Sequence, residues 1–244
     1  MGARKRPAQF PLVDISAQLS LAVSTLRFAE PVAYVYNPLH YAWNLHRQYL
    51  QRYGNGRKRV LFLGMNPGPW GMAQTGVPFG QIAAVADWMQ LRGKVGMPSP
   101  MHPKRQIAGL ACQRSEVSGA RLWGLMQEKF ATPEEFFADH FVINYCPLVF
   151  MEQSARNITP DKLARHEREL LASICDAALD SMLAYFEPEI IVGVGLYAEK
   201  QARRVVAKRP IRVGRILHPS PASPAANRGW AAQAQAQLSA LGIW

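Results

Sequence analysis

Two asparagines and one histidine stand out in this sequence, because each lies at the end of a short apolar run and beside proline or glycine. Asn66 belongs to Gly64-Met-Asn-Pro-Gly-Pro-Trp-Gly71, Asn144 precedes Tyr-Cys-Pro147, and His218 begins His-Pro-Ser-Pro221. Two carboxamides and an imidazole, with no carboxylate or thiol expected beside them, are suited to hydrogen-bonding recognition and to stabilising an oxyanion. Each residue alone has an ordinary structural explanation, but their joint placement favours a functional site.

These residues form one site only if the apolar runs before them are neighbouring strands. The runs are rich in β-branched and aromatic residues and cover residues 59–64, 141–146, 189–195 and 211–217. Helical patterns separate them, which predicts right-handed crossovers and a parallel sheet. We therefore expect an α/β fold, a three-layer α/β/α sandwich with a central, mainly parallel four-stranded sheet. Ligands bind outside the carboxyl ends of such strands, where the three residues lie.

Helix boundaries can also be predicted. The spacing of apolar residues indicates helices over residues 14–29 and 40–53. A hydroxyl residue followed by proline is typical of a helix start, and it occurs at Thr132-Pro133, Thr159-Pro160 and Ser223-Pro224. The second pair is predicted to open a long helix to about Phe186. Its predicted inward face consists of Leu163, Leu170, Ile174, Ala178 and Met182.

Four segments together resemble the single-strand-selective monofunctional uracil-DNA glycosylase family, over roughly residues 25–242. They are residues 64–80, 115–121, 144–148 and 218–230, and they contain G-M-N-P-G-P, G-V-P-F-G and H-P-S-P. This combination is far more specific than a lone glycine motif. The resemblance implies a DNA repair enzyme that flips uracil or a 5-substituted uracil out of DNA. It would hydrolyse the N-glycosidic bond and leave an abasic site without cutting the strand.

The resemblance also implies which residues take part in the reaction. Asn66 matches the catalytic asparagine that positions water near the sugar C1′, and His218 matches the histidine that stabilises negative charge on the departing base. Phe79 matches the aromatic that stacks on the flipped base, and Asn144 matches the amide that reads the uracil edge. These assignments suit an oxocarbenium-like transition state, in which the leaving pyrimidine becomes negatively charged.

The pocket near the uracil 5-position is a further expectation from the resemblance. The backbone of Met65 and Gly68 matches this part of the pocket, where the family accepts a hydroxymethyl group. The implied substrates are therefore uracil or oxidised thymine derivatives in single- or double-stranded DNA. Trp70 stands where phenylalanine is common in the family.

The charge of the chain agrees with a DNA partner. The net charge is +11 and the pI is near 9.9, an excess that points to a polyanion. Predicted phosphate contacts are Arg203, Arg204 and Lys208, within a basic run that precedes His218. The loop after His218 resembles the family's wedge, which enters the duplex. Its predicted DNA-contacting residues are Pro219, Ser220, Pro221, Ala222, Ser223 and Arg228.

Length and composition limit the remaining possibilities. The 244 residues, 49% of them hydrophobic, fit one domain over residues 1–244, with 1–13 as a flexible basic segment. Three distant cysteines indicate neither a disulfide framework nor a metal cluster, so we expect no metal and no cofactor. No apolar stretch approaches the ~18 residues of a membrane span. We expect a monomer, cytoplasmic and nucleoid-associated in a bacterium or nuclear in a eukaryote.

Two alternatives remain at this stage. Gly193-Val-Gly-Leu-Tyr-Ala198 has the form of a dinucleotide-binding fingerprint, but no acidic residue near position 213 could hold a ribose. Close packing of a helix on a strand is the preferred explanation of these glycines. The second alternative is a basic nucleic-acid-binding module that carries no chemistry, which release of uracil from DNA would exclude.

Overall fold

The computed structural model describes residues 10–207 and 209–244, and a parallel sheet of four strands forms its centre. The strands are β2 (Val60–Gly64), β3 (His140–Asn144), β6 (Ile190–Val194) and β7 (Arg212–Ile216). Their order is β3-β2-β6-β7, and every neighbouring pair is parallel. All four predicted strands are therefore confirmed, each to within two residues at its ends. β2 and β6 are buried along their whole length because they occupy the middle of the sheet.

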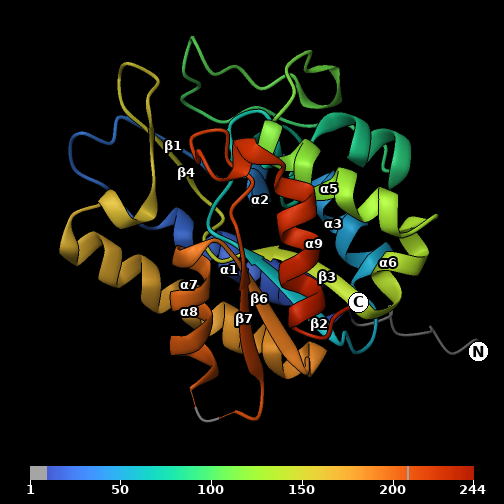
Figure 1. Cartoon of the computed structure of the whole chain (residues 1–244). Coiled ribbons are helices and arrows are strands. Elements are labelled where there is room, and N and C mark those ends of the chain that lie inside the picture. Colours follow the sequence, from blue (N-terminus) through green and yellow to red (C-terminus); the bar gives the residue numbers. More distant parts are fainter. Residues whose placement is uncertain (1–9, 208) are drawn as a thin grey trace, which may run out of the picture.

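Helices pack on both faces of this sheet, which gives the predicted three layers (Figure 1). α1 and α7 pack against each other on one side, where α8 also covers β6, and α9 covers β7 on the other with α5 against it. The helices are α1 (Pro11–Ser24), α2 (Pro38–Tyr41), α3 (Trp43–Tyr53), α4 (Met72–Thr75), α5 (Val117–Lys129), α6 (Pro133–Asp139), α7 (Arg165–Phe186), α8 (Leu196–Val206) and α9 (Trp230–Ala240).

A second, antiparallel sheet was not predicted from the sequence. It has the order β1-β4-β5 and consists of β1 (Tyr34–Tyr36), β4 (Val149–Met151) and β5 (Asn157–Ile158). Strands of two or three residues are too short to produce a readable alternation of apolar and polar positions. Strand β4 of this sheet follows closely after β3, so its pairing with β1 and β5 holds the chain just beyond Asn144.

The helices near the N-terminus differ from the prediction at their ends. α1 covers residues 11–24 rather than 14–29, so the last part of the expected flexible segment 1–13 is helical. Residues 1–9 lie outside the described part of the chain. The predicted helix 40–53 is two helices, because Asn37 caps α2 through Leu39 N–H and the chain turns at Ala42 before α3.

The long helix α7 starts later than predicted and faces differently. Thr159-Pro160 opens only a 3-10 turn (Pro160–Lys162), and α7 begins at Arg165, where the Glu167 carboxylate accepts hydrogen bonds from Ala164 and Ala29 N–H. Leu170, predicted to face inward, is 58% exposed, whereas Leu171 is 2% exposed. The prediction was wrong for Leu170, because α7 packs against α1 and α8 and the centre of its buried face lies one residue further along. Leu163 and Met182 are buried as predicted, and Ile174 and Ala178 are partly buried against the core.

The other two hydroxyl-proline pairs have different outcomes. Thr132 caps α6 as predicted, since its hydroxyl accepts a hydrogen bond from Glu135 N–H at 3.2 Å. Ser223-Pro224 does not start α9. A 3-10 turn (Ala226–Arg228) follows it, and Gly229 in the left-handed region (φ +88°) separates this turn from α9. Trp230, Ala234 and Leu238 are buried on α9.

The crossover through α8 determines which residues lie at which edge of the sheet. α8 begins directly after β6 and runs back, because Arg212 at the start of β7 pairs with Ile190 at the start of β6. The C-terminal end of α8 therefore lies at the opposite edge of the sheet from the carboxyl end of β7, which His218 follows in the sequence (Figure 1). Gly193 allows α8 this close approach, since a Cβ there would be 2.6 Å from Glu199 Cα. No helix in residues 10–207 and 209–244 combines the length and hydropathy needed to cross a bilayer.

Candidate active site

The carboxyl ends of β2 and β3 and the segment after β7 enclose one cleft, with a volume of about 360 Å³. Eight residues predicted to contact base or DNA line this cleft: Met65, Asn66, Gly68, Phe79, Asn144, His218, Ser220 and Pro221. The structure therefore brings both asparagines and the histidine into one cavity, although their sequence positions span more than 150 residues.

Asn66 is held by a hydrogen bond to the segment that follows β3. Its Nδ2 donates to the carbonyl of Leu148 at 3.1 Å. This bond uses the donor side of the amide and directs Oδ1 away from Leu148. Oδ1 can therefore accept a hydrogen bond from water in the cleft.

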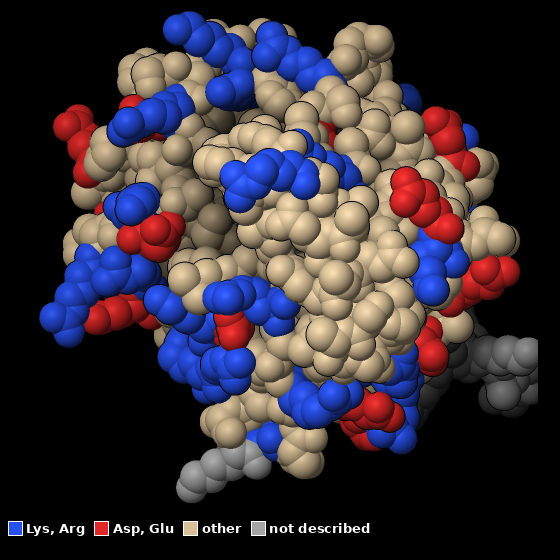
Figure 2. Space-filling model, in the orientation of Figure 1, with Lys and Arg blue, Asp and Glu red and all other residues tan. Residues whose placement is uncertain are grey.

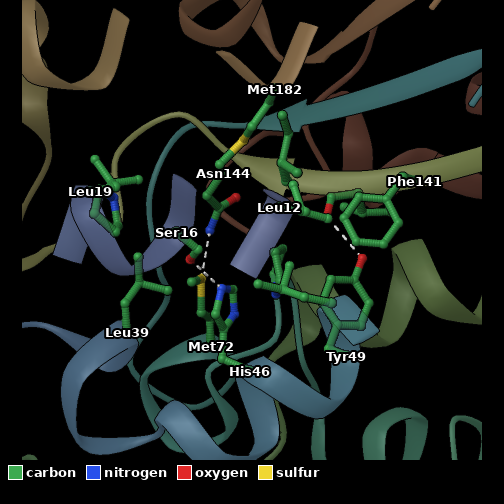
Figure 3. Close-up of a pocket in the computed structure, with 15 residues that line it drawn as sticks. Leu12, Ser16, Leu19, Leu39, His46, Tyr49, Met72, Phe141, Asn144 and Met182 are labelled. Atoms are coloured by element: carbon green, nitrogen blue, oxygen red, sulfur yellow. Dashed lines mark hydrogen bonds between the residues drawn. The ribbon is translucent and has the colours of Figure 1, made fainter. Parts of the chain in front are cut away.

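Asn144 at the end of β3 is oriented by a sulfur atom. Its Nδ2 donates to Met72 Sδ at 3.1 Å (Figure 3), while its Oδ1 is buried without a hydrogen-bond partner among the described residues. A thioether only accepts, so it selects the orientation in which the NH₂ group faces it. Gly64 provides the space, because a Cβ there would overlap Asn144 Oδ1 and lie 2.6 Å from the Phe79 ring.

A small cavity of about 30 Å³ lies behind Asn144, and this volume is close to that of one water molecule (Figure 3). Its wall includes Met72, Ser16 and His46, and Ser16 Oγ lies 2.7 Å from His46 Nε2. His46 Nδ1 lies 2.7 Å from the carbonyl of Gly76, which makes Nδ1 the protonated nitrogen and Nε2 the acceptor. Burial lowers the pKa of His46 to about 4, so the ring is neutral at pH 7.

Phe79 forms part of the cleft wall in a conformation that is rare for an aromatic residue. Its φ is +54°, in the left-handed region, and the side chain is 7% exposed. Gly119 on α5 makes this possible, because a Cβ there would overlap the carbonyl of Phe79. Such backbone conformations cost about 1–3 kcal/mol and concentrate at functional sites. The ring centroids of Phe79 and His218 are 6.3 Å apart.

His218 is fixed in one tautomer by its own loop. Ser220 N–H donates to His218 Nδ1 at 3.1 Å, so the ring proton of the neutral form is on Nε2. Burial lowers the pKa of His218, which keeps the ring neutral at pH 7. Gly195 lies against it, with its Cβ position 3.0 Å from His218 Cβ. The glycines of the apparent dinucleotide motif therefore serve helix packing and this histidine.

Comparison with known proteins identifies the family. A model of the uracil DNA glycosylase superfamily matches residues 51–239. The chain is 50% identical over 228 residues to the single-strand selective monofunctional uracil-DNA glycosylase of Rattus norvegicus, covering 93% of this chain and 82% of the rat protein. This chain belongs to that glycosylase family. The Bos taurus member is 51% identical over 220 residues, which cover 89% of this chain and 81% of the bovine protein.

A solved structure supports the fold independently of sequence. The crystal structure of SMUG2 from Pedobacter heparinus matches with a TM-score of 0.67 and covers 93% of this chain and 97% of that one. The two sequences are only 16% identical, so this likeness concerns the fold alone.

This glycosylase also has a carboxylate at its cleft, which the sequence interpretation excluded. Glu116, the residue before α5, lines the cleft beside Gly68 and Trp70. Burial raises the pKa of Glu116 to about 7. The prediction was wrong because Glu116 reaches the cleft from the start of a helix rather than from the end of a strand. The quoted segment Ser115–Arg121 contained the signal, as an acidic residue in an otherwise uncharged part of a motif.

The loop after His218, the predicted wedge of this family member, is tied down by hydrogen bonds. Arg121 donates to Pro219 O at 3.0 Å and to Asn227 Oδ1 at 2.9 Å, and Asn227 donates to Pro221 O at 2.8 Å. Ala222 and Arg228 are exposed. The loop therefore holds a defined shape at the side of the cleft.

The predicted phosphate contacts on α8 lie elsewhere. Arg203 pairs with Glu199 at 2.8 Å, and Arg204 pairs with Asp176 and donates to Tyr145 Oη. Both lie toward the C-terminal end of α8, away from the cleft, and Lys208 falls outside the described residues. Figure 2 shows Lys and Arg side chains both along the top of the face in view and again lower down, over α8 and β7.

Two arginines that the sequence interpretation missed lie at the cleft instead. The guanidinium carbons of Arg114 and Arg105 are 4.5 and 5.1 Å from the centroid of the Trp70 indole, which lines the cleft. Arg105 also donates to the carbonyl of Ala155, whereas Arg114 is exposed. These contacts join residues 70, 105 and 114, so sequence spacing gave no signal for them.

Proposed function

We infer that this chain is a monofunctional uracil-DNA glycosylase, which hydrolyses the bond between C1′ of deoxyribose and N1 of uracil. The observation that carries this conclusion is the convergence of Asn66, Asn144 and His218 on one cleft beside Phe79. Membership of a family whose curated members are named for this activity supports it.

His218 acts on the leaving group. Cleavage of the glycosidic bond leaves its electron pair on the pyrimidine, and the negative charge is delocalised onto the carbonyl oxygens. The Nε2–H group of neutral His218 donates to uracil O2, because Ser220 occupies Nδ1. One preorganised donor of this kind contributes ~2.7–4 kcal/mol to the transition state.

Asn66 acts on the nucleophile. The sugar develops positive charge as the base departs, so the attacking water needs orientation more than deprotonation. Asn66 Oδ1 accepts a hydrogen bond from this water, because its Nδ2 already donates to the Leu148 carbonyl. The water oxygen then bonds to C1′, and its proton is released as the abasic site forms.

Asn144 and Phe79 select the base. Asn144 Oδ1 accepts from uracil N3–H, and the free N–H of its Nδ2 donates to O4. Cytosine presents an acceptor at N3 and a donor at N4, so it would leave buried polar groups unpaired, at ~1–3 kcal/mol each. Phe79 stacks on the flipped base.

The cleft chemistry fits hydrolysis without strand cleavage. A lyase step requires an amine that forms a Schiff base with C1′. The described residues that line the cleft include no lysine. We therefore expect the reaction to stop at the abasic site.

Finer parts of the function are also proposed. Because Met65 and Gly68 present backbone at the cleft, the pocket accepts uracil bearing a small polar 5-substituent, as in oxidised thymine. The loop 219–223 contacts DNA beside the flipped base, with Arg228 near a phosphate. We propose that the chain acts as a monomer and a single domain, in the compartment that holds the DNA.

Release of uracil from a labelled single-stranded oligonucleotide tests the proposal directly. We expect free uracil and an intact strand that breaks only after alkali treatment. Binding of the oligonucleotide without release would favour a non-catalytic binding module, and strand breakage before alkali would contradict the monofunctional reaction.

A further inference from the structure

Glu116 is a half-buried acid in the cleft to which the reaction described above assigns no step. Its backbone precedes the first turn of α5, and its side chain turns toward the loop Pro67–Gly71, which we call the catalytic loop because it follows Asn66 directly. Its Oε2 is inaccessible to solvent and has no hydrogen-bond partner among the described residues.

The catalytic loop is shaped around this carboxyl group. The three atoms nearest to a Cβ built on Gly68 are all carboxyl atoms of Glu116, at distances under 3.0 Å. The same three atoms are the nearest to a Cβ on Gly71, at 2.8–2.9 Å. The carboxyl group thus occupies the space that side chains at positions 68 and 71 would fill, and glycine at both positions is a consequence.

The energetics indicate that this acid is retained for a purpose other than stability. Burial of an acid without a cationic partner disfavours its charged form and costs free energy. Burial raises the pKa of Glu116 to about 7, and the backbone N–H groups of Trp70 and Gly71 partly oppose this rise. These amides favour the ionised form, so ionised Glu116 holds the loop more firmly than protonated Glu116.

Few charged groups face Glu116 from the surrounding elements. Arg105 and Arg114 lie over the Trp70 indole, Arg121 on α5 is directed to Pro219, and neutral His218 lines the other part of the cleft. None of these four forms an ion pair with Glu116 in the described structure. The backbone amides are therefore the groups that respond to its charge.

We propose that Glu116 is a positioning residue for excision: its carboxylate holds the backbone of the catalytic loop and thereby fixes Asn66 and the wall formed by Gly68. This inference rests on the proposed glycosylase function. Glu116 acts through the loop and touches neither the base nor the water. Loss of its charge loosens the loop and lowers the rate of the chemical step, while DNA affinity is unchanged.

The experiment compares wild type with Glu116→Gln and Glu116→Asp in single-turnover excision of uracil from a single-stranded oligonucleotide, from pH 5.5 to 9. In the wild type, the rate at saturating protein rises with pH and is half-maximal near 7, since the ionised form is active. Glu116→Gln keeps the shape but not the charge, so we expect at least a tenfold lower plateau at pH 8 and no step near 7. Burial lowers the pKa of His218, so any change of rate caused by its titration occurs at a lower pH. This change should also be seen in Glu116→Gln.

The half-saturating protein concentration separates positioning from binding, and we expect it to change less than twofold in Glu116→Gln. Glu116→Asp retains the charge and is expected to recover part of the rate together with a pH step. Glu128→Gln is the matched control, because Glu128 is an exposed acid on the same helix. It should behave as wild type.

Three outcomes would overturn the proposal. They are a Glu116→Gln rate within twofold of wild type, a reduced rate that keeps the same pH step, and a wild-type profile with no step near 7. The last outcome is measured on the wild type alone, so it would overturn the proposal even if the variants fail to fold. If the wild type itself releases no uracil, the proposed function fails instead, so the two failures are distinguishable.

Discussion

The two asparagine amides of the cleft are each oriented by one hydrogen bond donated from Nδ2. Asn66 uses the Leu148 carbonyl and Asn144 uses the Met72 sulfur. These bonds fix the orientation of both amides: Oδ1 of Asn66 is directed away from Leu148, and Oδ1 of Asn144 is buried without a hydrogen-bond partner among the described residues.

Substitution of His218 or Asn66, the proposed catalytic pair, should strongly slow excision without loss of DNA binding. We expect His218→Leu to slow single-turnover excision by about 10²–10³-fold, the effect of one lost oxyanion donor, and Asn66→Ala to act in the same direction. Anisotropy with an intact uracil-containing strand should give affinities near that of the wild type. Asn55→Ala, at an exposed asparagine, is the control. Undiminished turnover in either variant would refute the mechanism.

Met72→Leu should weaken the reading of the base. Leucine fills the same space but accepts no hydrogen bond, so the Asn144 amide is free to rotate. One neutral hydrogen bond contributes about 1 kcal/mol, which corresponds to a roughly fivefold lower excision rate. Met182→Leu changes a methionine of the same small cavity whose sulfur is not bonded to Asn144. An equal loss in both variants would attribute the effect to packing alone.

At the scale of elements, buried polar contacts hold the helices behind the cleft. His46 on α3 joins Ser16 on α1 to Gly76, the residue that ends α4. α4 carries Met72, so this junction connects the packing of three helices to the side-chain amide of Asn144.

The junction predicts how stability depends on pH. The pKa of His46 is about 4 in the folded chain and 6.5 in a free histidine, so the unfolded chain binds the proton more readily. The contribution of neutral His46 to the stability of the folded chain is therefore complete above pH 6.5, and it is lost as the pH falls toward 4. The loss is about 3 kcal/mol of unfolding free energy. Denaturant titrations at pH 7 and 4 measure it, and His46→Gln should show a smaller decrease. Equal decreases would contradict the assignment.

At the scale of the whole molecule, two groups of arginines differ in how their charge is paired. Arg105 and Arg114 lie over Trp70 at the cleft, whereas Arg203 and Arg204 lie on α8 and are paired with acids. Paired arginines have less charge available for phosphates. We expect DNA affinity to depend more on the first group.

Arg114→Ala should lower the affinity for uracil-containing and undamaged single strands about equally, by about three- to tenfold at low salt, because phosphate contacts carry no base information. The slope of log affinity against log salt should fall by roughly 1. Arg203→Ala should change the affinity less than twofold. A larger effect of Arg203→Ala would restore the basic run on α8 as the main phosphate contact.

Sequence by itself determined the central sheet and the residues at the carboxyl ends of its strands. Continuous β-branched runs identify buried parallel strands, and parallel strands bring their ends to one edge, so the meeting of Asn66, Asn144 and His218 followed from local pattern and topology. The sequence also predicted that Gly193 serves the packing of a helix on its strand, because this glycine lies where a buried strand passes directly into a helix.

Only the tertiary structure decided the contacts that join segments distant in sequence. The inward face of α7 depends on α1, the three-stranded sheet depends on pairing across the chain, and Glu116 meets Gly68 only because α5 starts beneath the catalytic loop. The Arg114 and Trp70 stacking has the same origin. Such contacts leave no periodicity in the sequence, because they arise from packing between elements. The conformation of a single element does not determine them.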